Sequence, residues 1–211
     1  KWVLDFKVMN KTIHKLFPTP IFQFKVNNFE NLNKQLSEYI YELKRNDEKG
    51  IQKSNVNGWH SKNFKIEKGN VPYNFVKAIH EHVKEVIVDY YGWKYIPEKV
   101  GISEIWAIIN KKGTFNKSHN HPGSYLSAAY YVKAPKNCGN INFYDPNEIK
   151  KFNSPAIENL TELSTSGFSI KPEEGNLLIF PSYLYHDVGK NLSDDDRIVI
   201  SFNVSIIPSK N

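Results

Sequence analysis

The chain has 211 residues, 40% of them hydrophobic and 14% aromatic, and carries a formal net charge of +6. This composition excludes an intrinsically disordered chain, and the length suits one domain that buries a substantial core. No apolar run approaches the length of a membrane helix, and the single cysteine, Cys138, excludes an internal disulfide. Lysines are interleaved with acidic residues along the whole chain, so the sequence predicts neither a membrane partner nor a nucleic-acid groove.

The beginning of the chain bears on its domain organisation. The single methionine is Met9, and residues 1–8 carry charges within their apolar stretch, which is not the pattern of a secretory signal. We therefore expect one domain over residues 9–211, with residues 1–8 as an added or upstream extension, in a cytoplasmic protein. A homodimer stays open as an alternative to a monomer.

One strand and two amphipathic helices are predicted before residue 92. Residues 21–26 alternate between apolar and polar side chains, which is typical of a half-buried strand. A helix is predicted from Asn28, as its cap, to about residue 45, and a second one from about residue 72 to residue 91. Apolar residues three or four apart form one stripe on each helix: Leu32, Leu36, Ile40 and Leu43, then Phe75, Ile79, Val83 and Val86 or Ile87.

The segment between the helices is polar and rich in turn residues, and it ends at Trp59 and His60. These two side chains are either exposed near a functional site, or Trp59 packs on the core while His60 is solvated. His80 and His82 fall within the second predicted helix. Residues two positions apart on a helix diverge by about 200°, so we expect this pair to lie on the surface and not to share a metal ion.

From Gly101 onward the helical periodicity stops, and short apolar runs alternate with turn residues. The runs predict strands over residues 102–110, 125–133, 139–144, 167–171, 176–181, 184–188 and 196–207, with a longer surface excursion over 146–166. We therefore expect an α+β fold that is mainly β, with helical support over 28–91 and a core over about 101–207. A β-sandwich or jelly roll fits this order of elements.

The sequence His119-Asn120-His121 precedes an apolar run rich in aromatic residues. If this stretch is extended, both imidazoles point to one face, because side chains in a strand repeat every second residue. Neutral imidazole is a good ligand for iron, zinc, copper or nickel. The alternative is a pair of solvated histidines beside a turn.

A third imidazole and a basic group come from the last part of the chain. His186 follows a strand that is broken at Pro181-Ser182, and in a two-sheet barrel it is placed to complete a metal site with the pair. Arg197 opens a strongly apolar strand, where burial is costly unless the guanidinium pairs with an anion such as a bidentate carboxylate. The alternative is a surface arginine paired with Asp194, Asp195 or Asp196.

Several short motifs now share an order and spacing along the chain. They are Leu16-Phe17-Pro18-Thr19-Pro20, Gly58-Trp59-His60-Ser61, Trp106 through Asn110 to Gly113, His119-x-His121-Pro122, Leu126-Ser127 with Tyr130-Tyr131-Val132, Gly139-x-Ile141-x-Phe143 with Asp145-Pro146, Phe180-Pro181-Ser182 with His186, and Arg197-Ile198 through Ser201-Phe202-Asn203. Together they resemble the Fe(II)- and 2-oxoglutarate-dependent oxygenases, and most closely an uncharacterised bacterial and phage branch of the prolyl-hydroxylase-like superfamily.

The resemblance implies a double-stranded β-helix, or jelly roll, that binds Fe(II), 2-oxoglutarate and O2. It implies His119 as the first metal ligand, His186 as the distal one, and Arg197 as the residue that pairs with the C5 carboxylate of 2-oxoglutarate. It also implies a co-substrate pocket lined by Tyr131, Ser127, Asn110 and, as a weaker candidate, Ser201. The substrate side is assigned to Trp59, His60 and Trp106.

The chain departs from the superfamily at the second ligand position. The usual residue there is a carboxylate, whereas this chain has His121, so the predicted metal site holds three neutral imidazoles. That change raises the net charge of the metal site by one. It also leaves open whether iron is the native metal. Asp145 is the nearest conspicuous carboxylate, but it stands before a proline, where a turn role is expected.

The function that the resemblance implies is a dioxygenase that hydroxylates an unknown substrate while it decarboxylates 2-oxoglutarate to succinate. Two alternatives are a cupin-like three-histidine dioxygenase that does not use 2-oxoglutarate and a jelly-roll binding module that has lost turnover. Arg197 distinguishes the first alternative, since such an enzyme needs no carboxylate anchor there. Metal binding without consumption of 2-oxoglutarate distinguishes the second.

Overall fold

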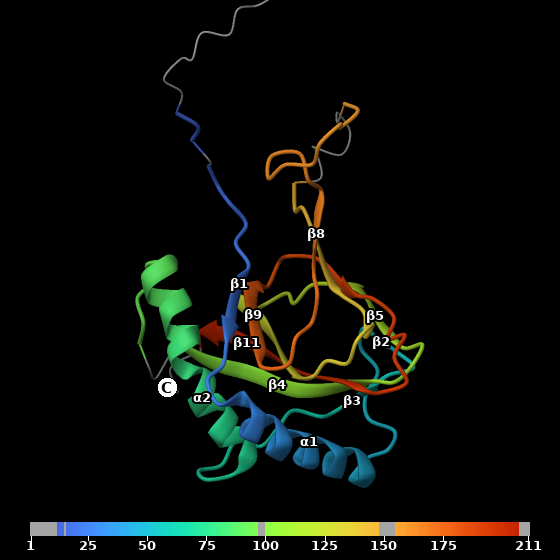
Figure 1. The fold of residues 1–211 in the computed structure, drawn as a ribbon. Coiled ribbons are helices and arrows are strands. Elements are labelled where there is room, and N and C mark those ends of the chain that lie inside the picture. Colours follow the sequence, from blue (N-terminus) through green and yellow to red (C-terminus); the bar gives the residue numbers. More distant parts are fainter. Residues whose placement is uncertain (1–11, 15, 97–99, 148–154, 207–211) are drawn as a thin grey trace, which may run out of the picture.

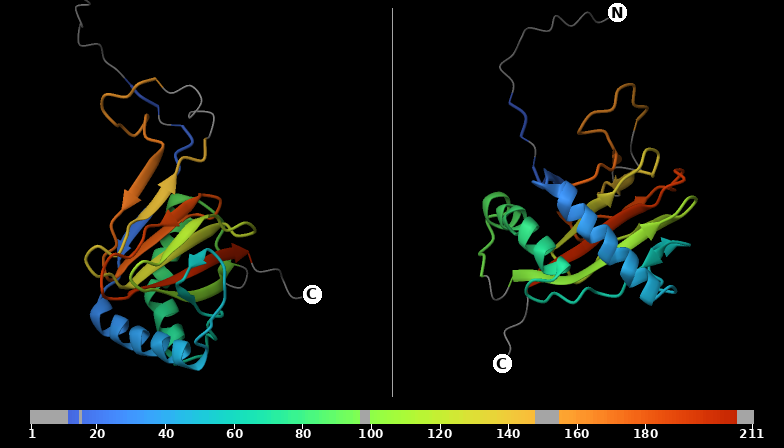
Figure 2. Two further views of the ribbon diagram at one scale, coloured as in Figure 1. Left: turned by 90° about the vertical axis from the view of Figure 1, so that its right-hand side faces the viewer. Right: turned by 60° about the horizontal axis from the view of Figure 1, so that its bottom comes forward.

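Two antiparallel sheets face each other in the computed structural model, and two helices cover the outer face of one sheet (Figures 1 and 2). The structure describes residues 12–14, 16–96, 100–147 and 155–206. The helices are α1 (Phe29–Asn46) and α2 (Val71–Glu85), and α2 continues directly into a π-helical turn, η1 (Val86–Tyr90). Neither α-helix combines the length and the apolar content of a membrane span, and the same holds for the rest of the described chain.

The larger sheet contains six strands, and the smaller sheet contains five. In spatial order the larger sheet runs β1 (Phe22–Lys25), β9 (Asn176–Pro181), β6 (Leu126–Lys133), β11 (Arg197–Ile206), β4 (Val100–Asn110) and β3 (Trp59–His60). The smaller sheet runs β2 (Asn55–Val56), β5 (Phe115–His119), β10 (His186–Val188), β7 (Ile141–Tyr144) and β8 (Gly167–Ile170).

Alternating side chains of the larger sheet build two separate cores. On β6, Tyr130 faces the helices, where it packs against Phe75 of α2 with ring centroids 5.0 Å apart. Its neighbour Tyr131 faces the other sheet and belongs to a second cluster with Phe143 and Phe180. This alternation follows from the two-residue period of a strand. It leaves the space between the sheets free for polar residues at one end.

The helical elements agree with the sequence prediction except at their ends. The apolar stripes of both helices pack on the larger sheet, as expected. Asn28 does not cap α1 through its side chain, because its backbone is left-handed with φ 52° and the side chain makes no cap hydrogen bond. The second helix is capped instead by Asn70, whose side-chain oxygen accepts a hydrogen bond from the Tyr73 N–H at 2.9 Å.

All the predicted strands are present with shifts of at most two residues at their ends, and the mainly β jelly-roll architecture is confirmed. Three strands were not predicted, namely β2, β3 and β5. The first two contain two residues each, too few for alternation to be visible, and β5 reads Phe-Asn-Lys-Ser-His, which is largely polar. Part of the predicted excursion over 146–166 lies outside the described residues, and its described end is exposed.

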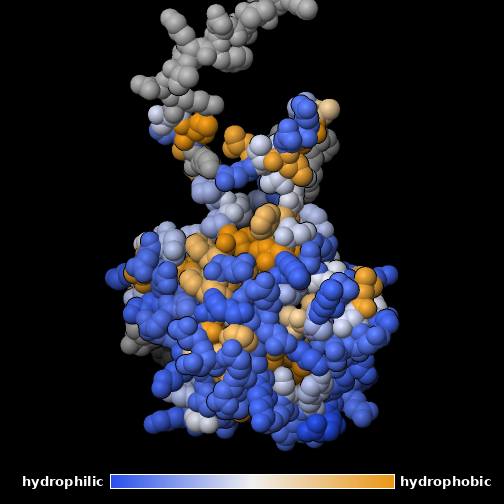
Figure 3. Space-filling view, viewed as in Figure 1, coloured by the Kyte–Doolittle hydropathy of each residue, from blue (hydrophilic) through white to orange (hydrophobic). Residues whose placement is uncertain are grey.

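The surface is mainly polar on the face that Figure 3 shows, apart from hydrophobic colour gathered below a projecting arm. The arm continues the β7–β8 hairpin beyond the body of the sheets (Figure 1). Phe168 of β8 and Leu163 near the arm are exposed. The candidate site lies between the two sheets.

Candidate active site

A cavity of about 700 Å³ lies between the two sheets. One wall is a ladder of paired residues on β4 and β11, whose register opposes Asn110 to Arg197 and Trp106 to Ser201. Between these polar pairs stand Ile108 and Val199, which also pair directly and line the cavity. The cavity therefore has two polar ends with an apolar middle along this wall. The opposite wall comes from β5 and β10.

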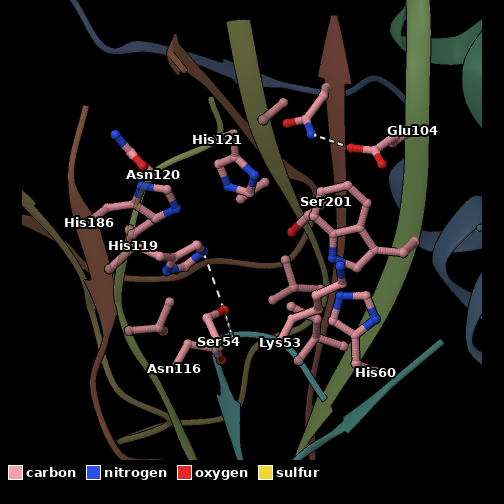
Figure 4. Close-up of a pocket in the computed structure, with 18 of the residues that line it drawn as sticks. Lys53, Ser54, His60, Glu104, Asn116, His119, Asn120, His121, His186 and Ser201 are labelled. Carbon is pink, nitrogen blue, oxygen red and sulfur yellow. Dashed lines mark hydrogen bonds between the residues drawn. The ribbon is translucent and has the colours of Figure 1, made fainter. Parts of the chain in front are cut away.

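Three histidines meet on that opposite wall. His119 ends β5 and His186 begins β10, and the antiparallel register pairs these two residues directly. His121 follows in the next loop, where its backbone N–H donates to the Ser182 carbonyl at 2.9 Å. One nitrogen of each imidazole lies within 4.8 Å of the other two, so the three residues form a candidate metal site. Figure 4 shows the three rings turned toward one another.

Backbone carbonyls orient two of the three imidazoles. Nδ1 of His119 lies 2.7 Å from the Lys117 carbonyl, and Nδ1 of His186 lies 3.0 Å from the Leu184 carbonyl. A carbonyl only accepts, so each Nδ1 carries the proton and each Nε2 presents its lone pair. This arrangement of a donor nitrogen held by the backbone and a free ligand nitrogen is typical of metal-binding histidines.

Burial keeps the three imidazoles neutral. Burial, and then the neighbouring His119, lower the pKa of His186 to about 3 and that of His121 to about 4. Burial also lowers the pKa of His119 itself. A neutral imidazole is the form that binds a metal ion, so near neutral pH no proton has to be displaced from any of the three. The chemistry of the donor set therefore fits a transition metal.

Two polar residues support His119 from the loop before β2 and from β5. The Ser54 hydroxyl lies 3.3 Å from Nε2 of His119, and the Asn116 side-chain amide donates to Ser54 Oγ at 3.2 Å. Asp145, the alternative carboxylate ligand, lies outside the cavity and accepts a hydrogen bond from the Asn147 N–H at 2.8 Å. It has the turn role that its position before Pro146 predicts.

Arg197 is fully buried at the other end of the ladder. Its Nη1 donates to three backbone carbonyls, those of Cys138, Gly139 and Gly189, the last two at 3.2 Å each. Nε and Nη2 are buried without a hydrogen-bond partner, and no ion pair with a carboxylate forms in the described part of the chain. These two nitrogens make up one edge of the guanidinium, the edge that binds a carboxylate through two parallel hydrogen bonds.

The surface alternative for Arg197 is therefore wrong. Asp194 pairs with Lys112 at 2.6 Å, and Asp195 pairs with Lys133 at 3.4 Å. Asp196 accepts a hydrogen bond from the Tyr41 hydroxyl at 3.0 Å. All three carboxylates have other partners, whereas the guanidinium points into the protein.

Three of the four residues expected around the co-substrate line the cavity. Asn110, Tyr131 and Ser201 line the cavity with Arg197. The Tyr131 phenol is buried near Arg197, and burial raises the pKa of Tyr131, so it remains a neutral hydrogen-bonding group. Ser127 does not line the cavity; it pairs with Asn203 across β6 and β11, and its hydroxyl donates to the Asn203 side chain at 2.8 Å.

Two of the three residues expected on the substrate side line the cavity. His60 and Trp106 stack with nearly parallel rings, 7° apart in plane and 5.6 Å between centroids. Trp59 points the other way, because successive residues of β3 face opposite sides. Its Nε1 donates to the Asp47 carbonyl at 2.7 Å, and its ring belongs to the helix-side core. The assignment of Trp59 to the substrate side is wrong, and the reading of His60 as solvated is also wrong.

Several lining residues were missed by the sequence analysis. They come from the loop before β2, from the far end of β4 and from β11: Lys53, Ser54, Glu104 and Asn203. Glu104 and Asn203 lie opposite each other in the ladder and share a hydrogen bond of 2.9 Å. Glu104 lies two residues from Trp106 on β4, and Asn203 lies two residues from Ser201 on β11. Because strand side chains repeat every second residue, this spacing could have predicted that both residues face the cavity. The loop residues had no comparable signal.

Comparisons with known proteins bear on this arrangement. Residues 104–203 match the family model described as "Putative 2OG-Fe(II) oxygenase", and this segment includes the three histidines and Arg197. A prolyl-4-hydroxylase from Pseudomonas putida superposes with a TM-score of 0.64 at 12% identity, over 90% of this chain and 94% of the other. Over residues 104–203, a little less than half of the chain, the protein matches the 2OG-Fe(II) oxygenase family, and the fold agrees with this match.

Other solved structures share the fold at similarly low identity. HygX from Streptomyces hygroscopicus, solved with nickel and 2-oxoglutarate, has a TM-score of 0.62 at 10% identity over 89% of this chain and 83% of its own. The epimerase SnoN from nogalamycin biosynthesis has a TM-score of 0.59 at 12% identity, over 92% and 83%. No curated protein matches the chain.

The family match over residues 104–203 confirms the resemblance found in the sequence, and the structural neighbours confirm the jelly-roll fold. It also agrees with the predicted cofactors, because the family is named for Fe(II) and 2-oxoglutarate and an oxygenase consumes O2. The cavity fits both cofactors through the three imidazoles and the unpartnered edge of Arg197. At the level supported by the family, the protein is an oxidoreductase.

Proposed function

We propose that the protein is an Fe(II)- and 2-oxoglutarate-dependent dioxygenase that hydroxylates a substrate C–H bond. In the balanced reaction, R–H, 2-oxoglutarate and O2 give R–OH, succinate and CO2. One oxygen atom enters the new hydroxyl group and the other enters the succinate carboxylate. The decarboxylation supplies the two electrons that O2 needs beyond those taken from the C–H bond.

His119, His121 and His186 would hold the metal, which supplies the activation of O2. The chain supplies neutral donors in a fixed orientation, since the Lys117 and Leu184 carbonyls hold the Nδ1–H groups of two of these imidazoles. Ser54 would give up its contact with Nε2 of His119 when a metal takes that lone pair. Three ligands on one side leave positions open for the co-substrate and O2.

The observation that carries the proposal is the unpartnered edge of Arg197. A guanidinium cannot lose its charge in a protein, and a buried cation without a counter-ion is strongly unfavourable. Nε and Nη2 lack partners, while Nη1 is fixed by three carbonyls. The fold thus holds a rigid fork whose free edge matches a carboxylate, in the same cavity as the three imidazoles.

The residues between these two groups suit a short dicarboxylate. Ile108 and Val199 line the cavity next to the Arg197 rung and offer apolar contact for methylene groups. The neutral Tyr131 hydroxyl lies beside the guanidinium, and Asn110 stands opposite it in the ladder. Arg197 would bind the C5 carboxylate, Tyr131 and Asn110 would line the pocket, and the other end of 2-oxoglutarate would face the imidazoles.

The three-histidine donor set also fits the cupin-like alternative, which does not use 2-oxoglutarate. That alternative leaves the buried charge of Arg197 without a ligand, and for this reason we favour the dioxygenase. The superfamily includes an epimerase as well as hydroxylases, so the fold alone does not select the outcome. We propose hydroxylation because it needs only the metal, 2-oxoglutarate and O2 that the cavity is proposed to bind.

The test is turnover of 2-oxoglutarate by the Fe(II)-loaded protein in air, measured as succinate formed. We expect slow succinate formation without added substrate and none from an Arg197→Ala variant at the same 2-oxoglutarate concentration. Metal binding without any succinate would favour the binding module instead. Oxygen consumption that does not depend on 2-oxoglutarate would favour the cupin-like enzyme.

A further inference from the structure

The outer half of the cavity contains a second donor without a partner. Trp106 is 8% exposed, and its Nε1 is buried with no hydrogen bond. The indole lies between His60, stacked on it at 5.6 Å, and the metal-site residue His121, whose ring centroid is 5.8 Å away. Buried indole N–H groups normally find an acceptor, as Trp59 does with the Asp47 carbonyl. Trp106 therefore lacks an acceptor that a ligand would provide.

The charges around Trp106 indicate the kind of acceptor. The charged residues that line the cavity are Lys53, Lys62, Lys117, Arg197 and one carboxylate, Glu104. Lys62 pairs with Asp47 at 3.2 Å, and Glu104 accepts from the Asn203 amide at 2.9 Å. Lys53 forms no ion pair within the described residues and lies near enough to His60 to lower the pKa of that residue. Figure 4 shows Lys53 beside His60, reaching into the cavity.

His60 contributes a neutral surface at this point. Its Nδ1 donates to the Ser61 carbonyl at 2.6 Å, and burial is the main factor that lowers its pKa. A neutral His60 adds no second positive charge next to Lys53. Lys53 is therefore the cavity lysine that lies beside the stacked His60 and Trp106 rings, with one indole donor nearby.

This donor pair is separate from the co-substrate anchor. Trp106 pairs with Ser201 in the ladder, four positions along β11 from Arg197. At about 3.3 Å per residue this is about 13 Å, more than one short dicarboxylate spans between its own carboxylates. An anion at Trp106 is consequently a different group from the C5 carboxylate of 2-oxoglutarate.

We propose that the primary substrate carries an acidic group, a carboxylate or a phosphate, that accepts a hydrogen bond from Trp106 Nε1 and pairs with the Lys53 ammonium. This inference rests on the proposed function, because it assigns the substrate's place beside the metal-site histidines. The acid would lie over the Trp106–Ser201 rung, with the rest of the molecule directed toward His121. Glu104 at the next rung repels a second acidic group there.

The test uses acids and their neutral counterparts as probes. Binding of phenylacetate, phenyl phosphate and phenylacetamide is measured by isothermal titration calorimetry on metal-loaded protein without oxygen, with 2-oxoglutarate at saturation. We expect at least one acid to bind about tenfold more tightly than the amide, which is the effect of about 1.4 kcal/mol from one charge-assisted hydrogen bond. The two acids distinguish a carboxylate site from a phosphate site.

Variants assign the preference to residues. Trp106→Phe keeps an aromatic ring and removes the N–H, and Lys53→Gln removes the charge from an exposed side chain whose loss leaves the core intact. Both are expected to abolish the preference for acids, and Lys53→Arg to retain it. Trp93→Phe and Lys112→Gln make the same chemical changes outside the cavity and are expected to leave it unchanged.

Arg197→Ala separates this inference from the proposed function. If the two sites are distinct, this variant loses 2-oxoglutarate affinity and keeps the acid preference in the absence of 2-oxoglutarate. A preference that disappears in Arg197→Ala and survives in Trp106→Phe would place the acid in the co-substrate subsite and overturn the inference. Equal binding of acids and amide, or no binding of either acid at millimolar concentration, would also overturn it.

Discussion

Arg197 is the residue whose substitution is expected to change co-substrate binding most. Its Nη1 is fixed by the carbonyls of Cys138, Gly139 and Gly189, and its other edge is free for a carboxylate. Arg197→Ala should weaken 2-oxoglutarate binding by about 2–5 kcal/mol, the usual cost of removing one partner of a buried charge pair. Calorimetric titration of the metal-loaded variant with 2-oxoglutarate measures this change.

Arg197→Lys is the informative companion variant. A lysine ammonium keeps the charge but cannot hold three carbonyls on one nitrogen while it offers two parallel donors to a carboxylate. We expect its 2-oxoglutarate affinity to fall close to that of Arg197→Ala, with metal content unchanged in both. Wild-type affinity in Arg197→Ala would show that the carboxylate binds elsewhere.

His80 and His82 provide the negative control for the metal site. His80 is exposed and hydrogen-bonds to Tyr95 at 3.0 Å, while His82 is half-buried and stacks on Phe24 at 4.8 Å. The prediction that both lie on the surface is thus correct for His80 and only partly so for His82. Replacing both with glutamine should leave the metal-to-protein ratio measured by elemental analysis unchanged. A fall in that ratio would contradict the assignment to His119, His121 and His186.

At the level of single residues, the chemical role of a side chain was easier to predict from the sequence than its direction and its neighbours. Two local patterns predicted the site correctly. They are the two-residue spacing of His119 and His121 and the apolar strand that follows Arg197. No local pattern placed Trp59 and His60, because which of the two faces the cavity depends on the pairing of a two-residue strand with β4. Lys53 and Ser54 are placed by tertiary contacts that no local pattern records.

At the level of elements, the support of Arg197 depends on two glycine-containing turns. Gly139 has φ +87°, and a Cβ there would collide with the Gly189 carbonyl oxygen and lie 2.7 Å from the Lys190 oxygen. Both the Gly139 and Gly189 carbonyls accept from Arg197. Gly139→Ala should lower the free energy of unfolding by about 2–4 kcal/mol, combining the strain of a positive φ with overpacking, and should weaken 2-oxoglutarate binding.

Gly113→Ala is the matched control for that substitution. Gly113 also has a positive φ, +82°, but a Cβ there meets no atom within 4 Å. This variant should lose only the conformational part, about 1 kcal/mol, and keep its co-substrate affinity. Denaturant unfolding and calorimetry on the two variants provide the comparison. Equal losses in both would show that the contact between the turns at 139 and 189 contributes nothing.

The strand order of the elements could be predicted only in outline. The apolar runs indicated where most strands lie, since alternation is a local property. The pairing of His119 on β5 with His186 on β10 could not be derived, because residues so far apart in the sequence are brought together by sheet closure. The prediction that Asn28 caps the first helix was wrong for a local reason. Asparagine tolerates the left-handed backbone conformation that Asn28 has here.

At the scale of the whole molecule, the metal should couple two segments that lie far apart in the sequence, the β5 segment and β10 of the smaller sheet. His119 and His121 come from one segment and His186 from another, so a shared ion binds the folded state and not the unfolded chain. Metal at about 100 times its dissociation constant should add about 2.7 kcal/mol to the free energy of unfolding. The midpoint temperature should rise with metal concentration and fall after chelation, and scanning calorimetry records both.

His186→Gln is the control for this stabilisation. The variant removes one of the three donors and should lose most of the metal-dependent rise in midpoint temperature, whereas the His80 and His82 replacements should keep it. A rise of wild-type size in His186→Gln would mean that the metal binds to other groups.

The central claim is that one cavity binds the metal and 2-oxoglutarate together, and anaerobic titration of the Fe(II)-loaded protein with 2-oxoglutarate tests it most directly. We expect a visible metal-to-ligand charge-transfer absorption that saturates with one equivalent of bound co-substrate, and that shifts to much higher 2-oxoglutarate concentration in Arg197→Ala. If the iron-loaded protein shows no such band at millimolar 2-oxoglutarate, the claim is contradicted.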